Sequence, residues 1–171
     1  MDNFEISFNF LMDNEDSSRE YKTVPDAPEG SYSISGINSH FFPEEFSRIN
    51  ALEPSQRGPL VEEFYKKHFW TEWMEKMVSS AVVKRYFDAS VNMGNGAATK
   101  ILQKAINLSY PNPITIDGSM GPLTLNVANS MPDNILVPSF KMVREDFYKS
   151  IVKVNPSLEK YLDGWLIRAS K

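Results

Sequence analysis

The 171-residue sequence contains no cysteine and only two histidines, His40 and His68. The absence of cysteine excludes disulfides and thiolate metal sites. The two histidines lie far apart in the sequence and lack the spacing of a metal site, so we expect no metal and no other cofactor. The longest apolar runs are a few residues, far short of the roughly 20 needed to cross a bilayer. We therefore expect no stable membrane insertion.

An excess of positive charge is also missing, since the formal net charge is -4 and the pI about 5.3. A chain without a basic field is a poor nucleic-acid binder. The N-terminus carries Asp2 and Glu5 where a secretory signal would carry Lys or Arg. We expect no Sec-type signal and a cytoplasmic protein. Hydrophobic residues make up 42% of the chain, which predicts a globular protein. The length of 171 residues predicts one cooperative unit, and we expect a monomer.

The pattern of apolar residues predicts a first helix that ends on a carboxylate. Phe4, Phe8, Leu11 and Glu15 share one face of that helix. Residues 19–36 are rich in Pro, Gly, Ser and Asp and predict a small β-hairpin.

The rest of the chain predicts helices. Pro43 suits the first position of one of them. The fold class is therefore mainly α, a helical bundle with one small β-hairpin after the first helix. The further helical segments are expected at residues 59–77, 82–93, 97–108, 123–130, 139–154 and 157–169.

Two carboxylates are candidates for chemistry. Hydrolysis of a glycosidic bond needs a protonated carboxylic acid beside a second carboxylate that activates water or attacks the sugar. Glu15 is placed for the first role, and Asp26 in the hairpin could face it across a cleft. The hydroxyls of Tyr32 and Ser33 could hold a water or a sugar. The structural alternative is that Glu15 is a solvated helix end and Asp26 an ordinary turn residue.

Motifs in a fixed order along the chain connect it to a known family. The distance from Phe4 to Glu15 matches the helix that leads to that family's catalytic Glu, and Asp26, Gly30, Ser33 and Gly36 follow its next stretch approximately. On these residues the sequence resembles glycoside hydrolase family 108, the phage-type muramidases and holin-associated secretion activators. Further matching residues are Tyr65, Trp70, Phe87-Asp88, Val91-Asn92, Gly94, Leu102-Gln103, Asp117-Gly118, Met120-Gly121-Pro122, Thr124, Arg144, Phe147-Tyr148, Gly164-Trp165 and Arg168.

The resemblance implies an N-acetylmuramidase, an endolysin-type enzyme that cleaves the β-1,4 bond between N-acetylmuramic acid and N-acetylglucosamine of bacterial peptidoglycan. Glu15 would be the proton donor, with Asp26 as its partner. Residues 1–86 would form a lysozyme-like catalytic lobe and residues 87–171 a helical lobe of the peptidoglycan-binding type. The enzyme would wait in the host cytoplasm and reach the periplasm and cell wall when a holin opens the membrane.

The sequence departs from the family beside the proposed acid. Asp16, Ser17 and Ser18 stand where the family has Gly-Gly-Tyr, and Ser33 stands where it has Thr. These changes indicate a remodelled hairpin. Asp16 could interact with Glu15 or simply be solvated.

Two residues outside the hairpin are candidate substrate contacts. Asn92 could touch substrate or bond to backbone at a helix end, and Trp73 could be an exposed platform for a sugar or a core residue. A different class of function stays open: a non-catalytic cell-wall-binding or virion structural protein that kept this fold. A third is a secretion or lysis accessory that acts on the wall of its own cell.

Overall fold

The computed structural model describes all residues from 1 to 171, and the chain divides into two compact units, Met1–Trp70 and Thr71–Lys171. The mainly helical fold and the small sheet directly after the first helix confirm the fold class predicted from the sequence. No helix combines the length and the apolar character that a membrane span requires.

The first unit begins with helix α1, Asn3–Glu15, whose N-cap is Asp2. The Asp2 side chain accepts a hydrogen bond from the backbone N–H of Glu5 at 2.8 Å, which satisfies one of the donors that a helix start leaves open. The spacing seen in the sequence places Phe4, Phe8 and Leu11 in the core. Glu15 is the last residue of the helix and is partly exposed.

A three-stranded antiparallel sheet follows, in the order β1-β2-β3. Ser35 and Gly36 form the two-residue connection between β2 and β3, and both have positive φ, 47° and 83°. This combination is typical of the hairpin turn whose twist matches that of the flanking strands. The strands are β1 (Thr23–Asp26), β2 (Ser31–Ile34) and β3 (Ile37–Asn38).

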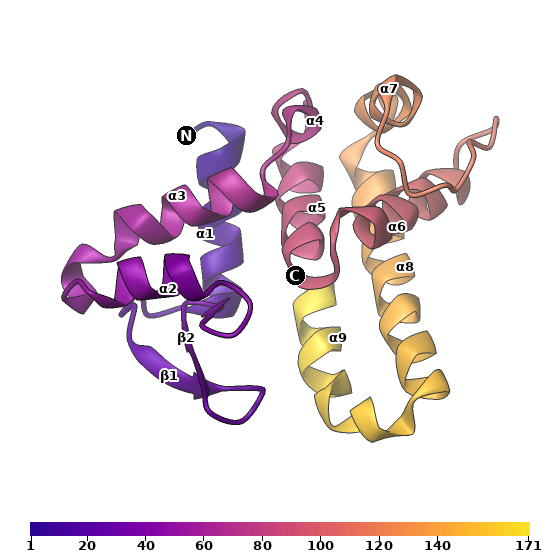
Figure 1. Cartoon of the computed structure of the whole chain (residues 1–171). Helices are drawn as coiled ribbons and strands as arrows, with labels where there is room; N and C mark the ends of the chain where they lie inside the picture. Colours follow the sequence, from indigo (N-terminus) through magenta and orange to yellow (C-terminus); the bar gives the residue numbers. More distant parts are fainter. The chain divides into compact units, whose positions relative to one another are not determined.

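Helices α2 (Pro43–Asn50) and α3 (Gly58–Phe69) complete the first unit, with the short 3-10 helix η1 (Pro54–Gln56) between them. A ring contact connects α3 to α1: the Tyr65 ring centroid lies 6.1 Å from that of Phe8. Figure 1 shows α2, α3 and the sheet within this unit.

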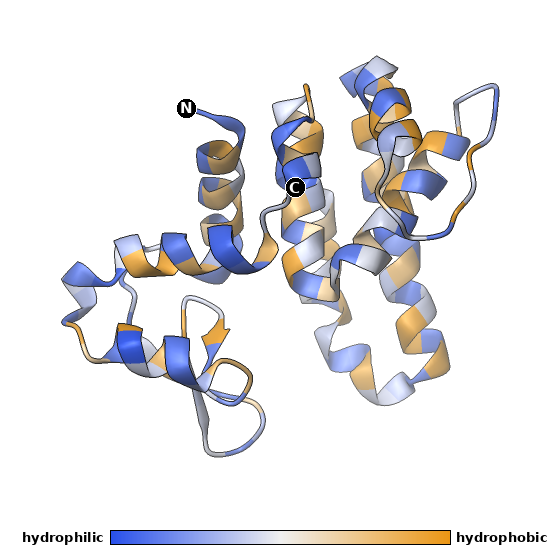
Figure 2. Ribbon diagram, turned by 45° about the horizontal axis from the view of Figure 1, so that its top comes forward, coloured by the Kyte–Doolittle hydropathy of each residue, from blue (hydrophilic) through white to orange (hydrophobic).

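The second unit contains seven helical segments. Helices α5, α6 and α8 form its core, where Phe87, Leu102, Ala105 and Phe140 are buried. Its helices carry hydrophobic stripes next to hydrophilic ones, as Figure 2 shows. The segments are α4 (Glu72–Glu75), α5 (Ser80–Met93), α6 (Asn95–Asn107), α7 (Pro122–Ser130), α8 (Asp133–Val154), η2 (Pro156–Tyr161) and α9 (Leu162–Ser170).

Three predicted segments differ from the structure. The helix expected over residues 59–77 is interrupted, because Trp70 is extended with ψ 126° and Thr71 caps a new helix by accepting a hydrogen bond from the N–H of Met74. The units divide at this break, earlier than the boundary after residue 86 expected from the sequence. The helix expected at 139–154 begins at Asp133 and includes Pro138. The segment 157–169 is part 3-10 helix and part α-helix.

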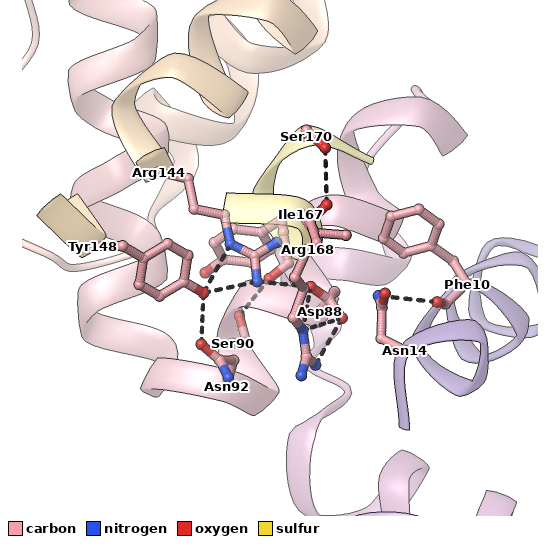
Figure 3. A network of polar contacts seen from close by, with 11 residues as sticks. Phe10, Asn14, Asp88, Ser90, Asn92, Arg144, Tyr148, Ile167, Arg168 and Ser170 are labelled. Carbon is pink, nitrogen blue, oxygen red and sulfur yellow. Dashed lines mark hydrogen bonds and ion pairs between the residues drawn. The ribbon is translucent and has the colours of Figure 1, made fainter. Parts of the chain in front are cut away.

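A buried ion network connects α5, α8 and α9 (Figure 3). Asp88 is fully buried, and its carboxylate oxygens lie 2.7 Å from the guanidinium of Arg144 and 2.8 Å from that of Arg168. The Arg144 guanidinium also donates to the hydroxyl of Tyr148, which in turn donates to the side-chain oxygen of Asn92 at 2.6 Å. Two guanidinium groups therefore share the single carboxylate of Asp88.

Replacing Asp88 with Asn should destabilise the protein strongly, because the substitution leaves the guanidinium of Arg144, 1% exposed, without its counter-charge. Loss of one partner of a buried ion pair costs about 3–5 kcal/mol. Urea unfolding measures this loss. The control is Glu145→Gln, since Glu145 pairs with Lys149 at the surface, 3.8 Å apart, and should contribute little. Equal unfolding midpoints for the two variants would contradict the assignment.

Candidate functional site

The Glu15 carboxylate lies against the Ser35-Gly36 turn. A Cβ atom built on Gly36 would lie 2.7 Å from Glu15 Oε2 and 2.7 Å from the hydroxyl of Tyr65. Real Cβ atoms essentially never approach another atom so closely. Glycine at this position therefore lets the turn close on the end of α1.

Both sides of the turn are anchored through Ser35. The Ser35 hydroxyl donates to Asp16 Oδ2 at 2.8 Å, and the Tyr65 hydroxyl donates to the Ser35 carbonyl at 2.7 Å. Ser35 is buried and its positive φ is unusual for a residue with a side chain. The two hydrogen bonds hold it in that conformation, as surrounding structure must for any strained backbone.

Asp16 organises the segment that follows Glu15. Its carboxylate accepts hydrogen bonds from the backbone N–H groups of Glu20 and Tyr21 and from the hydroxyls of Ser18 and Ser35. Burial acts to raise the pKa of Asp16, but these hydrogen bonds outweigh it and hold the pKa below its usual value. Asp16 is thus an ionised structural group next to Glu15.

A second buried cation fixes the start of β1. Arg57 is 6% exposed and donates to the carbonyls of Tyr21, Asn50 and Leu52 and to the side-chain oxygens of Thr23 and Asn50. Tyr21 is another residue with positive φ, 52°. The backbone N–H of Tyr21 donates to Asp16, and its carbonyl accepts a hydrogen bond from Arg57. These two bonds stabilise the strained conformation of Tyr21.

A hollow of about 210 Å³ opens beside Glu15. Val24 from β1 and Ser35 from the turn form its strand side, and charged groups surround it. Lys22 pairs there with Glu20 at 2.8 Å, and this carboxylate raises the pKa of Lys22. The residues lining the hollow are Glu15, Asp16, Ser18, Glu20, Lys22, Val24 and Ser35.

Asp26 does not line this hollow. It lies on the same sheet face as Val24, two residues and about 7 Å further along β1. Its carboxylate accepts hydrogen bonds from the N–H of Ala27 at 2.8 Å and from the side-chain amide of Asn38 at 2.9 Å. Asp26 is exposed, and its bond with Asn38 connects the two outer strands of the sheet.

Tyr32 and Ser33 are adjacent on β2, so their side chains leave the sheet on opposite faces. Ser33 pairs with Val24 and shares its face, but is only 6% exposed. Tyr32 is 50% exposed on the other face. The hydroxyls of Tyr32 and Ser33 therefore lie on opposite faces of the sheet and cannot hold the same water molecule.

The other two predicted contacts lie in the second unit. Asn92, at the end of α5, accepts the hydrogen bond from Tyr148 described above, which gives it a structural role. Trp73 in α4 is partly exposed, and the ammonium of Lys76 lies 5.0 Å from its ring centroid. No three histidine or acidic side chains come together as metal ligands.

Sequence reasoning did not find the residues that position Glu15. Gly36 and Tyr65 appeared in it only as matches to the family. Ser35 gave no signal, because its role depends on hydrogen bonds to residues 19 and 30 positions away.

Replacing Gly36 with Ala should destabilise the first unit by more than the backbone strain of about 1–2 kcal/mol that a positive φ imposes, because the new methyl group meets Glu15 and Tyr65. Gly30→Ala is the matched control: Gly30 has a similar φ of 88°, but nothing lies within 4 Å of an added Cβ. Thermal unfolding of both variants measures the difference. Equal losses would show that the close contact at Gly36 is unimportant.

Replacing Asp16 with Asn should make stability less dependent on pH in acid. The lowered pKa of Asp16 means that its ionised form stabilises the fold above the unfolded value of about 3.9. This contribution disappears as the pH falls through the folded-state pKa. Urea unfolding at pH 7 should show Asp16→Asn to be less stable than wild type, with the gap closing below about pH 4. For the control Asp163→Asn, at an exposed position of α9, the difference in unfolding free energy from wild type should not change with pH. A difference that stays constant with pH for Asp16→Asn would refute the pH linkage.

Comparison with known proteins gives two findings. Residues 97–170 match the family model described as "Predicted Peptidoglycan domain". The fold is similar to the structure of Brucella abortus SagA, with a TM-score of 0.68 and 17% sequence identity over 98% of this chain and 89% of that chain. No curated protein matches. The chain therefore has the fold of SagA, and the match of its C-terminal region supports an association with peptidoglycan.

Proposed function

We propose that this protein is a peptidoglycan hydrolase, an N-acetylmuramidase in which Glu15 protonates the leaving glycosidic oxygen. The observation that carries the proposal is the position of the Glu15 carboxylate, held against the Gly36 turn and open to a hollow beside the hairpin. The resemblance to family 108 muramidases and the match of residues 97–170 to a predicted peptidoglycan domain support the same substrate.

The geometry favours attack by water over direct attack by Asp26. Retaining glycosidases place their two carboxylates about 5 Å apart, whereas inverting enzymes leave room for a water between them. Asp26 lies two residues beyond Val24 on β1 and outside the hollow that Glu15 lines. A sugar bound over this face of the hairpin would have Glu15 at one end and Asp26 at the other. In this scheme Asp26 would act as a base on water.

Glu15→Gln should lower the release of reducing ends from purified cell walls at least a hundredfold, because general acid catalysis contributes roughly that much or more. The amide is close in shape to the carboxyl group, so the unfolding midpoint should stay near that of wild type. Glu53→Gln is the control, since Glu53 is an exposed carboxylate of the same unit outside the hollow. Near-normal hydrolysis by Glu15→Gln would exclude Glu15 as the acid.

One observation favours a second candidate, a non-catalytic wall-binding protein. Asp16, the neighbour of Glu15, and Asp26, its predicted partner, both take part in structural hydrogen bonds: Asp16 with the loop and the turn, and Asp26 with Ala27 and Asn38. The same assay separates the two functions. Wild-type protein that binds walls without releasing reducing ends would select the binding protein over the enzyme.

A further inference from the structure

The hollow beside Glu15 contains a second carboxylate that water can reach, that of Glu20. Both residues line this space of about 210 Å³. Glu15 is the last residue of α1, and Glu20 lies in the loop between α1 and β1. The Glu20 side chain is 53% exposed. Hydrolysis of a glycosidic bond by attack of water needs a base within reach of that water as well as an acid. Glu20 is therefore a candidate for the base.

Asp16 also lines the hollow, but its carboxylate is fully used by the fold. Its Oδ1 atom accepts hydrogen bonds from the Ser18 hydroxyl and the N–H of Glu20. Its Oδ2 atom accepts hydrogen bonds from the Ser35 hydroxyl and the N–H of Tyr21. An ionised carboxylate has about four lone-pair sites, so a proton taken up by Asp16 would displace one of these donors. Asp16 therefore serves the loop and the turn.

Asp26 lies outside the hollow, and both of its oxygens hold the hairpin. Oδ1 accepts a hydrogen bond from the N–H of Ala27 at 2.8 Å, and Oδ2 accepts one from the side-chain amide of Asn38 at 2.9 Å. A water held next to Glu15 would thus have Asp26 beyond the space that it occupies.

The Glu20 carboxylate has one oxygen that the fold leaves open. The ammonium of Lys22 lies 2.8 Å from Oε2 of Glu20, and this carboxylate raises the pKa of Lys22. Oε1 accepts no hydrogen bond from the protein and can accept one from water. The backbone of Glu20 is nevertheless fixed, because its N–H donates to Asp16 at 3.3 Å. Glu20 thus combines an available oxygen with a defined position in the hollow of the proposed acid.

We propose that Glu20 activates the attacking water, in place of the Asp26 considered above. The inference rests on the proposed muramidase function and names the second catalytic group of the same site. Glu20 takes a proton from the water, and the water oxygen forms the new bond to the anomeric carbon. The bond from this carbon to the glycosidic oxygen breaks, and Glu15 gives its proton to the leaving oxygen. The configuration at the anomeric carbon is inverted, and solvent then restores both carboxyl groups.

Glu20→Ala tests this inference in the full chain acting on purified cell walls. The variant should lower kcat for the release of reducing ends about a hundredfold, with KM near that of wild type, because it removes the base and not a sugar contact. The unfolding midpoint should hardly change, since the lost ion pair with Lys22 is exposed. Glu29→Ala is the matched control, because Glu29 is an exposed carboxylate of the same hairpin outside the hollow.

Added sodium azide separates a catalytic from a structural role of Glu20. Azide is already an anion and needs no base, and it can enter the space that the alanine leaves. Its nitrogen forms the bond to the anomeric carbon while Glu15 protonates the leaving oxygen. Azide should therefore restore turnover of Glu20→Ala and give an α-glycosyl azide, detected by mass spectrometry and NMR. Asp26→Ala should form no such product.

Three results would overturn the role of Glu20: near-normal kcat of Glu20→Ala, loss of activity without an azide product, or azide rescue of Asp26→Ala instead. A wild-type product with retained β configuration would also exclude it as the base on water. Glu15→Gln distinguishes this failure from that of the proposed function. An inactive Glu15→Gln beside an active Glu20→Ala would refute Glu20 alone, whereas wild-type protein that releases no reducing ends would refute both.

Discussion

The geometry around Glu15 depends on the closure of the Ser35-Gly36 turn against the end of α1. Three elements meet there: α1 through Glu15, the turn itself, and α3 through Tyr65, whose hydroxyl donates to the Ser35 carbonyl. Ser35 has a conformation that it would not adopt alone, and the hydrogen bond to Asp16 stabilises it. The position of the proposed acid is thus set by residues that do not themselves take part in proton transfer.

The helix that carries Glu15 could be predicted from the sequence, because its apolar spacing and its terminal carboxylate are local features. The hairpin could be predicted for the same reason, from its Gly, Pro and Ser content. The structural role of Asp16 could not be predicted from the sequence. Its carboxylate bonds to Tyr21 and Ser35, and a bond to a residue 19 positions away leaves no local pattern. The difference between Asp16-Ser17-Ser18 and the Gly-Gly-Tyr of family 108 did not indicate which hydrogen bonds form at this position.

Capping and burial explain two differences between the predicted and the observed helices. The apolar spacing of residues 59–77 suited one helix, yet the Thr71 side chain caps a new one after the extended Trp70. Pro138 did not stop α8, because buried Leu136 and Phe140 anchor the helix on both sides of it. Several family-like motif residues proved to be structural: Asp88, Arg144 and Arg168 form the ion network, and Gln103 holds the loop before α7.

The net charge of -4 appears unsuited to a wall that is itself anionic. The charges relevant to binding, however, are those within a Debye length of the ligand, about 8–10 Å at ordinary ionic strength. Between α6, α8 and the loop before α7, Lys100 and Lys104 lie in the same lining as Asp117 and Asp146. Hydrogen bonds from Gln103 and Ser119 and the charge of Lys100 hold the pKa of Asp117 below its usual value. The net charge of the whole chain therefore says little about the charge that one such surface presents. The global charge affects how fast the protein and the wall meet, and the local arrangement decides which group of the wall is held.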